Sequence, residues 1–236
     1  MGKDRKGVAV TKQREWIGAR FREKLILGLL VSLSLTLGSP LIKVYASINQ
    51  KEQLIPILGI TMDKKHAGTM AFLVLTFEDR QDQGGLAVHF RTTPGRFSPM
   101  AQTSVEQAIR RAAQSLHLST DSWTVTLSVP YVGLTVYGDS LSAMVGLSVI
   151  ALAQGKVVPS DRVITGTITP EGHIGRVGSV SLKVSAAHGT QLNRVIVPDE
   201  QDPTDRDWQT PFLMHVYPVG SVFKAYNALT EDDSRP

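Results

Sequence analysis

Apolar and β-branched residues gather in three short runs in the first half of the folded part of the chain, a pattern typical of β-strands. The runs span residues 57–62, 70–77 and 85–91, and turn-forming residues separate them at 63–68 and 78–84. Short turns between consecutive strands favour antiparallel neighbours. The pattern therefore predicts an antiparallel meander.

Apolar residues three or four positions apart predict a helix that begins at Thr103. Thr103-Ser104-Val105-Glu106 matches a capping box, in which the threonine hydroxyl accepts a hydrogen bond from the amide of Glu106 and the glutamate side chain reaches back. A strand is predicted next, over residues 123–129, and it ends at Pro130.

The second half of the chain mixes helices and strands without strict alternation. Residues 142–153 are small and apolar on nearly every side, which predicts a buried helix with Gly155 at its C-terminal end. The other predicted elements are strands at 162–169, 193–197 and 212–219 and helices at 179–188 and 221–229. This mixture favours an α+β fold over a doubly wound parallel sheet.

Near the N-terminus, residues 25–42 form an uncharged stretch rich in Leu, Ile and Val. As a helix of about 18 residues it would be roughly 27 Å long, enough to cross a hydrocarbon core. The preceding residues 1–24 hold eight Lys or Arg and three Asp or Glu. Because positive flanks stay in the cytoplasm, we expect a single-pass anchor with the folded part on the extracytoplasmic side.

Two alternatives to the membrane anchor stay open. A cleaved signal peptide would have an apolar core at 25–37 and a cleavage site after Val44-Tyr45-Ala46, and it too would export the folded part. A core helix of the folded domain is the other. The patterns thus predict a basic cytoplasmic N-terminus (1–24), a transmembrane or signal-anchor segment (25–42), a tether (43–55), a folded domain (56–230) and a polar tail (231–236).

The net charge of the chain is +4, with a pI of about 9.4, which raises the question of a nucleic-acid partner. Residues 1–24 alone carry +5, so the remaining residues sum to −1. The basic residues therefore form a leader and not a phosphate-binding face, and no nucleic-acid partner is expected.

Candidate chemistry is narrowed by what the sequence lacks. It contains no cysteine, which excludes a thiol nucleophile, a thiolate metal site and disulfides. The His-Glu-x-x-His and Gly-x-x-x-x-Gly-Lys-Ser/Thr motifs do not occur, and we expect no metal or cofactor. What stands out is the run Gly138–Met144, followed by Lys183. A serine needs a base to become a nucleophile, and a lysine that loses its proton through burial can act as that base.

From Tyr131 onward, the order of residues and elements resembles the proteolytic domain of the Lon family. The resemblance is carried by Gly138-Asp139-Ser140-Leu141-Ser142, similar to the archaeal-type Gly-Asp-Ser-Ala-Ser loop, by Thr165-Gly166-Thr167-Ile168-Thr169, by the turn 172–178, by the helix 179–187 and by the strand Arg194–Pro198. It covers residues 131–198 well, whereas residues 56–130 match only in the order of elements.

The resemblance implies a Lon-type proteolytic fold (ribosomal protein S5 domain 2-like) over residues 56–230, with Ser142 as nucleophile and Lys183 as general base. It further implies a hydroxyl, Thr165, beside the lysine, and an Asp139 able to pair with Lys183 in a resting form. The family cleaves polypeptides and assembles as hexameric rings, so a polypeptide substrate and a homo-oligomer are expected. Because the sequence lacks the family's ATP-driven module, the expected activity is an ATP-independent Ser-Lys endopeptidase.

Three residues near the candidate site differ from the family pattern, and two other functions compete with the endopeptidase hypothesis. Met144, Arg176 and Ser179 replace, in turn, a small residue, a proline and a glycine of the family pattern. Taken singly, Ser142 can be a helix cap and Lys183 a surface charge. A catalytically inactive Lon-like interaction domain is one rival function. A Ser-His-Asp hydrolase is another, because six histidines are present: His66, His89, His117, His173, His188 and His215.

Overall fold

The structure is a computed structural model that describes residues 50–64, 66–200, 202, 205 and 215–231. All of them belong to the second of two compact units, Ala46–Pro236. The predicted segments 1–24 and 25–42 and the first part of the predicted tether lie outside the described residues. In the described ranges, no helix combines the length and the apolarity that a membrane span requires.

A four-stranded sheet contains β1 (Gln50–Ile60), β2 (Gly68–Asp79), β3 (Ala87–Phe90) and β5 (Trp123–Ser128), in the order β1-β2-β5-β3. β2 pairs antiparallel with both β1 and β5, whereas β3 lies parallel to β5. The predicted meander is therefore wrong at its third strand, because β5 lies between β2 and β3.

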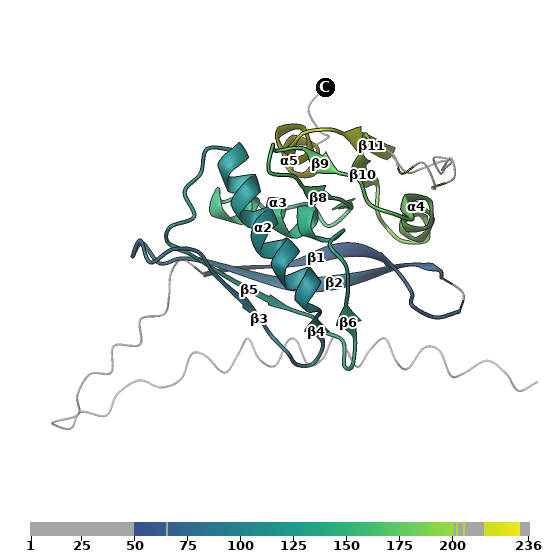
Figure 1. Ribbon diagram of the computed structural model, residues 1–236, viewed down its shortest axis with the longest axis horizontal. Coiled ribbons are helices and arrows are strands. Elements are labelled where there is room, and N and C mark those ends of the chain that lie inside the picture. The colour runs from purple at the N-terminus through teal and green to yellow at the C-terminus, as the bar shows by residue number, and fades with distance from the viewer. Residues whose placement is uncertain (1–49, 65, 201, 203–204, 206–214, 232–236) are drawn as a thin grey trace, which may run out of the picture. The chain divides into compact units, whose positions relative to one another are not determined.

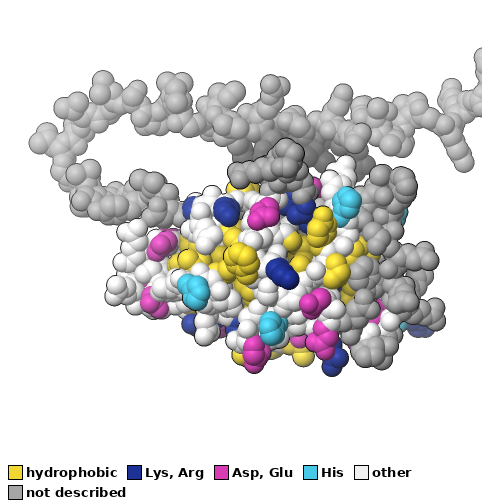
Figure 2. All heavy atoms as spheres, turned by 90° about the horizontal axis from the view of Figure 1, so that it is seen from above, with side chains coloured by type: hydrophobic (Ala, Val, Ile, Leu, Met, Phe, Trp, Pro, Cys, Tyr) yellow, Lys and Arg dark blue, Asp and Glu magenta, His cyan; other side chains and the backbone are white. Residues whose placement is uncertain are grey.

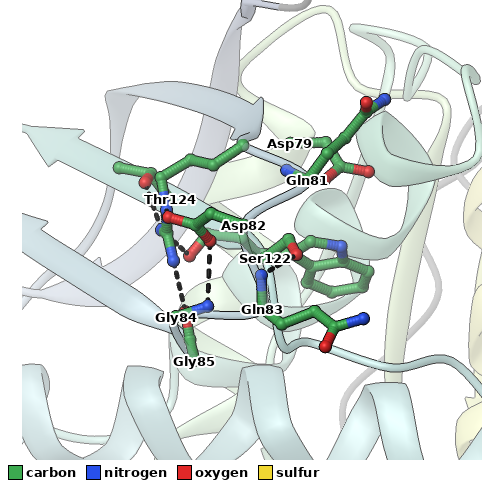
Figure 3. Close-up of polar contacts among 10 residues, drawn as sticks. Asp79, Gln81, Asp82, Gln83, Gly84, Gly85, Ser122 and Thr124 are labelled. Carbon is green, nitrogen blue, oxygen red and sulfur yellow. Dashed lines mark hydrogen bonds and ion pairs between the residues drawn. The ribbon is translucent and has the colours of Figure 1, made fainter.

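Arg80, the residue after β2, bonds to the beginning of β5 and to the turn that precedes β3, and Figure 3 draws the polar contacts of this region. Its guanidinium donates to Trp123 O at 2.9 Å, to Thr124 Oγ1 at 2.5 Å and to Gly85 O at 2.6 Å. The same group pairs with Asp82 at 2.8 Å, and this hydrogen bond lowers the pKa of that carboxyl group. These bonds stabilise the contact between the end of β2 and the start of β5, and β3 pairs with the other edge of β5.

The first strand begins earlier than expected. Gln50 already pairs with Glu78, so residues 50–55, predicted as part of a tether, belong to the sheet. The side chain of Gln53 fixes this strand further, because it donates to Val158 O at 2.5 Å and accepts from Val158 N at 3.2 Å. An amide side chain that pairs with backbone in this way acts like an extra strand partner, which alternation along the sequence does not reveal.

The first described helix, α2 (Pro99–Ser115), begins four residues before the predicted Thr103. Its N-cap is Ser98, whose hydroxyl accepts from Ala101 N at 3.2 Å, and Pro99 follows at the first helical position. Glu106, assigned by sequence to a capping box, instead pairs with Arg110 at 2.9 Å one turn later. The prediction failed because two start signals lie close together, and the Ser-Pro pair comes first.

The central helix is α3 (Ser142–Ala153), whose predicted bounds are confirmed. Every residue from Ser142 to Leu152 is buried, because α3 contacts α2, α5 and the strands β1 and β2. The helices lie on one side of the four-stranded sheet (Figure 1). Gly146 permits close approach to α2, since a Cβ there would lie 3.0 Å from Ala108 O.

The remaining elements complete an α+β arrangement. They are β4 (Arg96–Phe97), β6 (Thr135–Val136), β7 (Arg162–Ile164), β8 (Thr167–Ile168), β9 (Ile174–Gly175), α4 (Val180–His188), β10 (Arg194–Pro198), β11 (His215–Val219) and α5 (Val222–Thr230). β7, β10 and β11 form a separate parallel sheet in the order β11-β10-β7. The strand predicted over 162–169 is interrupted at residues 165–166, whose backbone bonds to other partners.

Ser148, in the middle of α3, is fully buried, and its hydroxyl has no hydrogen-bond partner in the part of the chain that the structure describes. Since a buried hydroxyl without a partner costs free energy, Ser148→Ala is expected to raise the free energy of unfolding by about 1 kcal/mol. Urea denaturation monitored by circular dichroism measures it. The matched control is Ser98→Ala, which removes the N-cap of α2 and should lower the free energy of unfolding by about 1 kcal/mol. A loss of stability in Ser148→Ala would contradict the interpretation that the Ser148 hydroxyl is buried without a hydrogen-bond partner.

Candidate active site

A cleft of about 990 Å³ opens beside the ends of several elements. Its walls come from the end of β1 and the residues after it (57–63), the start of β2 (69–71), the segment 131–141 apart from Val132, the turn 177–179, and Lys183. Asp139, Ser140 and Lys183 thus line one cavity, although the lysine lies on a different element. None of the six histidines, all of which are described, lines this cleft.

Ser142, the predicted nucleophile, is the first residue of α3 and is only 1% exposed. The four residues before it, Gly138–Leu141, line the cleft. The amide of Ser142 donates to Asp139 O at 2.9 Å, and the amide of Ala143 donates to Gly166 O at 3.1 Å. In this conformation, these two amides at the start of α3 are therefore already paired.

Thr165, predicted as a hydroxyl beside the lysine, is completely buried and contacts the loop Gly138–Leu141 that precedes Ser142. Its hydroxyl donates to Ser140 O at 3.4 Å, and Gly166 N donates to the same carbonyl at 2.9 Å. Thr165 N in turn donates to Ile196 O at 3.0 Å, in the neighbouring β10. The interruption between β7 and β8 therefore holds the loop before Ser142 in place.

Lys183, the predicted base, is buried, with 4% of its surface exposed. Burial lowers its pKa from 10.5 to about 8, while the charges of Asp139 and Asp205 oppose part of this shift. Within the described residues, the lysine forms neither a hydrogen bond with Ser142 nor an ion pair with Asp139. A buried lysine with a lowered pKa is not an ordinary surface charge.

The start of α4, which carries Lys183, has an unusual backbone. Ser179, the predicted replacement for a family glycine, has φ of 58° and ψ of 37°, in the left-handed region that glycine adopts most easily. Its side chain makes no capping hydrogen bond. Instead, the carboxylate of Asp205 accepts hydrogen bonds from Val180 N and from Ser181 Oγ, the latter at 2.7 Å.

Asp205 is a site residue that the sequence did not reveal. It lies 25 residues beyond Val180, and no local pattern connects the two positions. On another side of α4, a Cβ on Gly68 would lie 1.9 Å from Leu182 O, so β2 approaches the helix as closely as its backbone allows. Contacts with Asp205 and Gly68 thus define where Lys183 lies.

Large apolar side chains gather at the cleft. Met62 is 77% exposed and Tyr137 is 61% exposed, and both line it, as do the partly exposed Tyr131 and Leu134. Figure 2 shows hydrophobic side chains beside side chains of both charges on the face that it draws, without a large patch of one charge. The surface feature beside the candidate site is therefore apolar.

The sequence of the chain is similar to a known protein family and to several known proteins. Residues 92–209, half of the chain, match the family described as Lon protease (S16) C-terminal proteolytic domain. The chain is 30% identical over 101 residues to the archaeal Lon protease of Archaeoglobus fulgidus, covering 42% of this chain and 16% of that protein. It is 30% identical over 122 residues to the peroxisomal Lon protease homolog 2 of Bos taurus, covering 47% and 14%. With the Lon protease of Desulforamulus reducens it shares 22% identity over 162 residues, covering 66% and 19%. The chain thus spans less than a fifth of the length of each relative.

Proposed function

Because the chain belongs to the Lon protease (S16) proteolytic-domain family, we propose that it is a serine endopeptidase with Ser142 as nucleophile and Lys183 as general base. The observation that carries this proposal is the desolvated Lys183, which lines the same cleft as the loop leading into Ser142. With a pKa of about 8, a substantial fraction of the lysine is neutral near physiological pH and can accept a proton.

In the proposed reaction, Lys183 Nζ takes the proton of Ser142 Oγ while the oxygen attacks the scissile carbonyl carbon. The tetrahedral intermediate collapses when the ammonium returns that proton to the departing amine, which leaves an ester on Ser142. A water molecule then attacks the ester, and Lys183 takes its proton and returns it to Ser142 Oγ. The peptide bond is thereby hydrolysed, and the enzyme is regenerated without a cofactor.

We assign supporting roles to Thr165 and Asp139. Thr165 orients the loop Gly138–Leu141, which precedes the proposed nucleophile, through its hydrogen bond to Ser140 O. Asp139 favours the charged form of Lys183, because a carboxylate near an ammonium group raises its pKa. The backbone oxygen of Asp139 also accepts the hydrogen bond of the Ser142 amide. At the start of a helix, such an amide could otherwise donate to the oxyanion of the tetrahedral intermediate. We propose that this pairing marks a resting form, although the expected Asp139–Lys183 ion pair is not formed among the described residues, and that substrate binding moves the loop Gly138–Leu141.

The cleft favours an extended, unfolded polypeptide as substrate. β1 is an edge strand, and its residues 57–60 line the cleft, so that an extended chain can pair with its open edge. The apolar side chains of Met62, Leu134 and Tyr137 would contact apolar side chains of the substrate. Such segments are exposed in unfolded proteins and buried in folded ones.

The cellular setting is also a proposal. The apolar segment 25–42 would anchor the chain in a membrane, with residues 1–24 in the cytoplasm and the protease domain on the extracytoplasmic side, or would be cleaved during export. Residues 43–49 would then serve as the tether that leads into β1. An extracytoplasmic location fits an activity that requires no ATP. Self-association, as in hexameric Lon rings, belongs to the same proposal.

Hydrolysis of unfolded casein by the full-length protein, in the absence of nucleotide, tests the activity. We expect cleavage that a chelator leaves unchanged and that a peptide boronic acid inhibits, because boron bonds to an activated serine oxygen. ATP should not accelerate it. An absence of cleavage of both casein and short apolar peptides between pH 7 and pH 10 would favour the non-catalytic interaction domain instead.

A further inference from the structure

The helix that carries Lys183 begins without a local cap. Most helices begin with a residue in extended conformation whose own side chain accepts from an amide of the first turn. Here Ser179 is left-handed, and its hydroxyl makes no such bond. The carboxylate of Asp205 takes that place, with one oxygen on Val180 N and the other on Ser181 Oγ. The start of α4 is thus held by a tertiary contact.

This contact acts on Lys183 through a single helical turn. Val180 and Ser181 are the first two residues of α4, and Lys183 is the fourth, so one turn of 3.6 residues separates the bound end from the lysine. Lys183 N closes that turn by donating to Ser179 O at 3.2 Å. Because Gly68 contacts the backbone of Leu182, α4 cannot move toward β2 to compensate for a lost contact at its start.

Asp205 also acts on the charge of the lysine. Two carboxylates act on Lys183: Asp139 in the loop before Ser142 and Asp205 at the start of α4. A third, Asp63, lines the same cleft as the lysine. The Asp139 and Asp205 carboxylates favour the ammonium form and oppose the effect of burial. Of these two, only Asp205 is also bonded to the helix that carries the lysine.

We infer that Asp205 is a positioning residue for the general base: its carboxylate fixes the first turn of α4 and, with it, the place of Lys183 in the cleft. The inference rests on the proposed function, in which Lys183 takes the proton of Ser142. A base that is displaced by a fraction of an ångström transfers a proton less often, and its rate falls even when the substrate still binds.

The test compares Asp205→Asn and Asp205→Ala with a matched control, Glu200→Gln. Glu200 lies in the same connection after β10, and its exposed carboxylate is 3.4 Å from Arg176, so the control removes one charge without touching α4. In Asp205→Asn, we expect kcat to fall about tenfold with little change in KM, because the amide keeps one acceptor but loses the paired carboxylate. Asp205→Ala should lose more, and Glu200→Gln should match the wild-type rate.

The pH dependence of kcat/KM separates positioning from general destabilisation. Removing the carboxylate lowers the pKa of Lys183 further, so the acid limb of the profile should move to lower pH in Asp205→Asn but not in Glu200→Gln. A purely structural role would lower the plateau and leave the limb in place. The pKa of Lys183 can also be measured without relying on activity, by NMR titration of the inactive Ser142→Ala variant. The titration is repeated after Asp205→Asn is added, and the two pKa values are compared.

The outcomes distinguish this inference from the proposed function. If Asp205→Asn keeps the wild-type kcat and the wild-type acid limb, Asp205 does not position the base, while the Ser-Lys assignment stands. If the plateau falls only in proportion to a loss of folded protein, measured by circular dichroism, and the limb stays in place, Asp205 is a structural cap alone, and the inference is overturned. If Ser142→Ala retains activity, the proposed function itself fails.

Discussion

Replacing Ser142 with alanine should lower kcat/KM for an unfolded protein substrate by roughly 10⁴-fold or more, because no other group can form the acyl-enzyme. The fold should survive, since the hydroxyl of Ser142 makes no hydrogen bond among the described residues. Initial rates of casein cleavage measure the loss. Circular dichroism and a urea titration confirm that the variant is folded.

The matched control for this experiment is Ser140→Ala, two positions earlier in the same loop. Ser140 lines the cleft directly and is more exposed than Ser142, so accessibility alone would select it as the nucleophile. Only its carbonyl is bonded to Thr165 and Gly166, and alanine keeps that carbonyl. We therefore expect the Ser140→Ala rate to stay within a few-fold of the wild type. Loss of activity in Ser140→Ala with retention in Ser142→Ala would reverse the assignment.

Replacing Lys183 with methionine should abolish cleavage and stabilise the fold at the same time. Methionine fills a similar volume but accepts no proton, so kcat/KM should fall by about 10³-fold or more. The lowered pKa means that the charged form of Lys183 destabilises the folded state. The displacement from 10.5 to about 8 corresponds to about 3 kcal/mol at 1.36 kcal/mol per pH unit.

The sign of this stability effect follows from proton binding. Between pH 8 and pH 10.5, the unfolded chain keeps the lysine proton while the folded protein releases it, so wild-type stability rises with pH across this window. Below pH 8 both states are protonated, and the full cost is present. The gain from Lys183→Met should therefore be largest at pH 7 and small above pH 10.5. Urea unfolding at pH 7 and at pH 10 measures it.

Lys183→Arg is the control for charge. Arginine stays protonated throughout this pH range, so it cannot act as the base, and it should be inactive and less stable than the methionine variant. In the wild type, the acid limb of kcat/KM should lie near pH 8. A wild-type profile that is flat between pH 6.5 and pH 9, or a methionine variant that still cleaves casein at the wild-type rate, would exclude Lys183 as the base.

Local patterns predicted the elements that carry the two residues proposed to react. The helix 142–153 and the helix ending at His188 were found correctly, because small apolar runs between glycine-rich turns favour buried helices independently of distant residues. Where two local signals competed, as at Ser98 and Thr103, the pattern could not rank them. The placement of Thr165 beside the lysine stays a prediction, and what the structure gives is its hydroxyl bonded to Ser140 O in the loop before Ser142.

Other features of the site depend on contacts between distant residues. Arg80 links the end of β2 to β5 through bonds to residues more than 40 positions away, and no local pattern reveals that β5 lies between β2 and β3. The anchoring of α4 by Asp205 spans 25 residues and carries no periodic signal. The pKa of Lys183 depends on how many atoms surround it, which folding alone determines.

The amino-acid sequence alone thus predicted the helices, most of the strands, the resemblance to the family and the two residues proposed to react, because periodicity and short motifs are local properties of the chain. The folded structure determined that Lys183 is desolvated, that the cleft also borders the loop before Ser142, and that the amides at the start of α3 are already paired. These properties arise from burial and long-range hydrogen bonds, which depend on which surfaces meet when the chain folds.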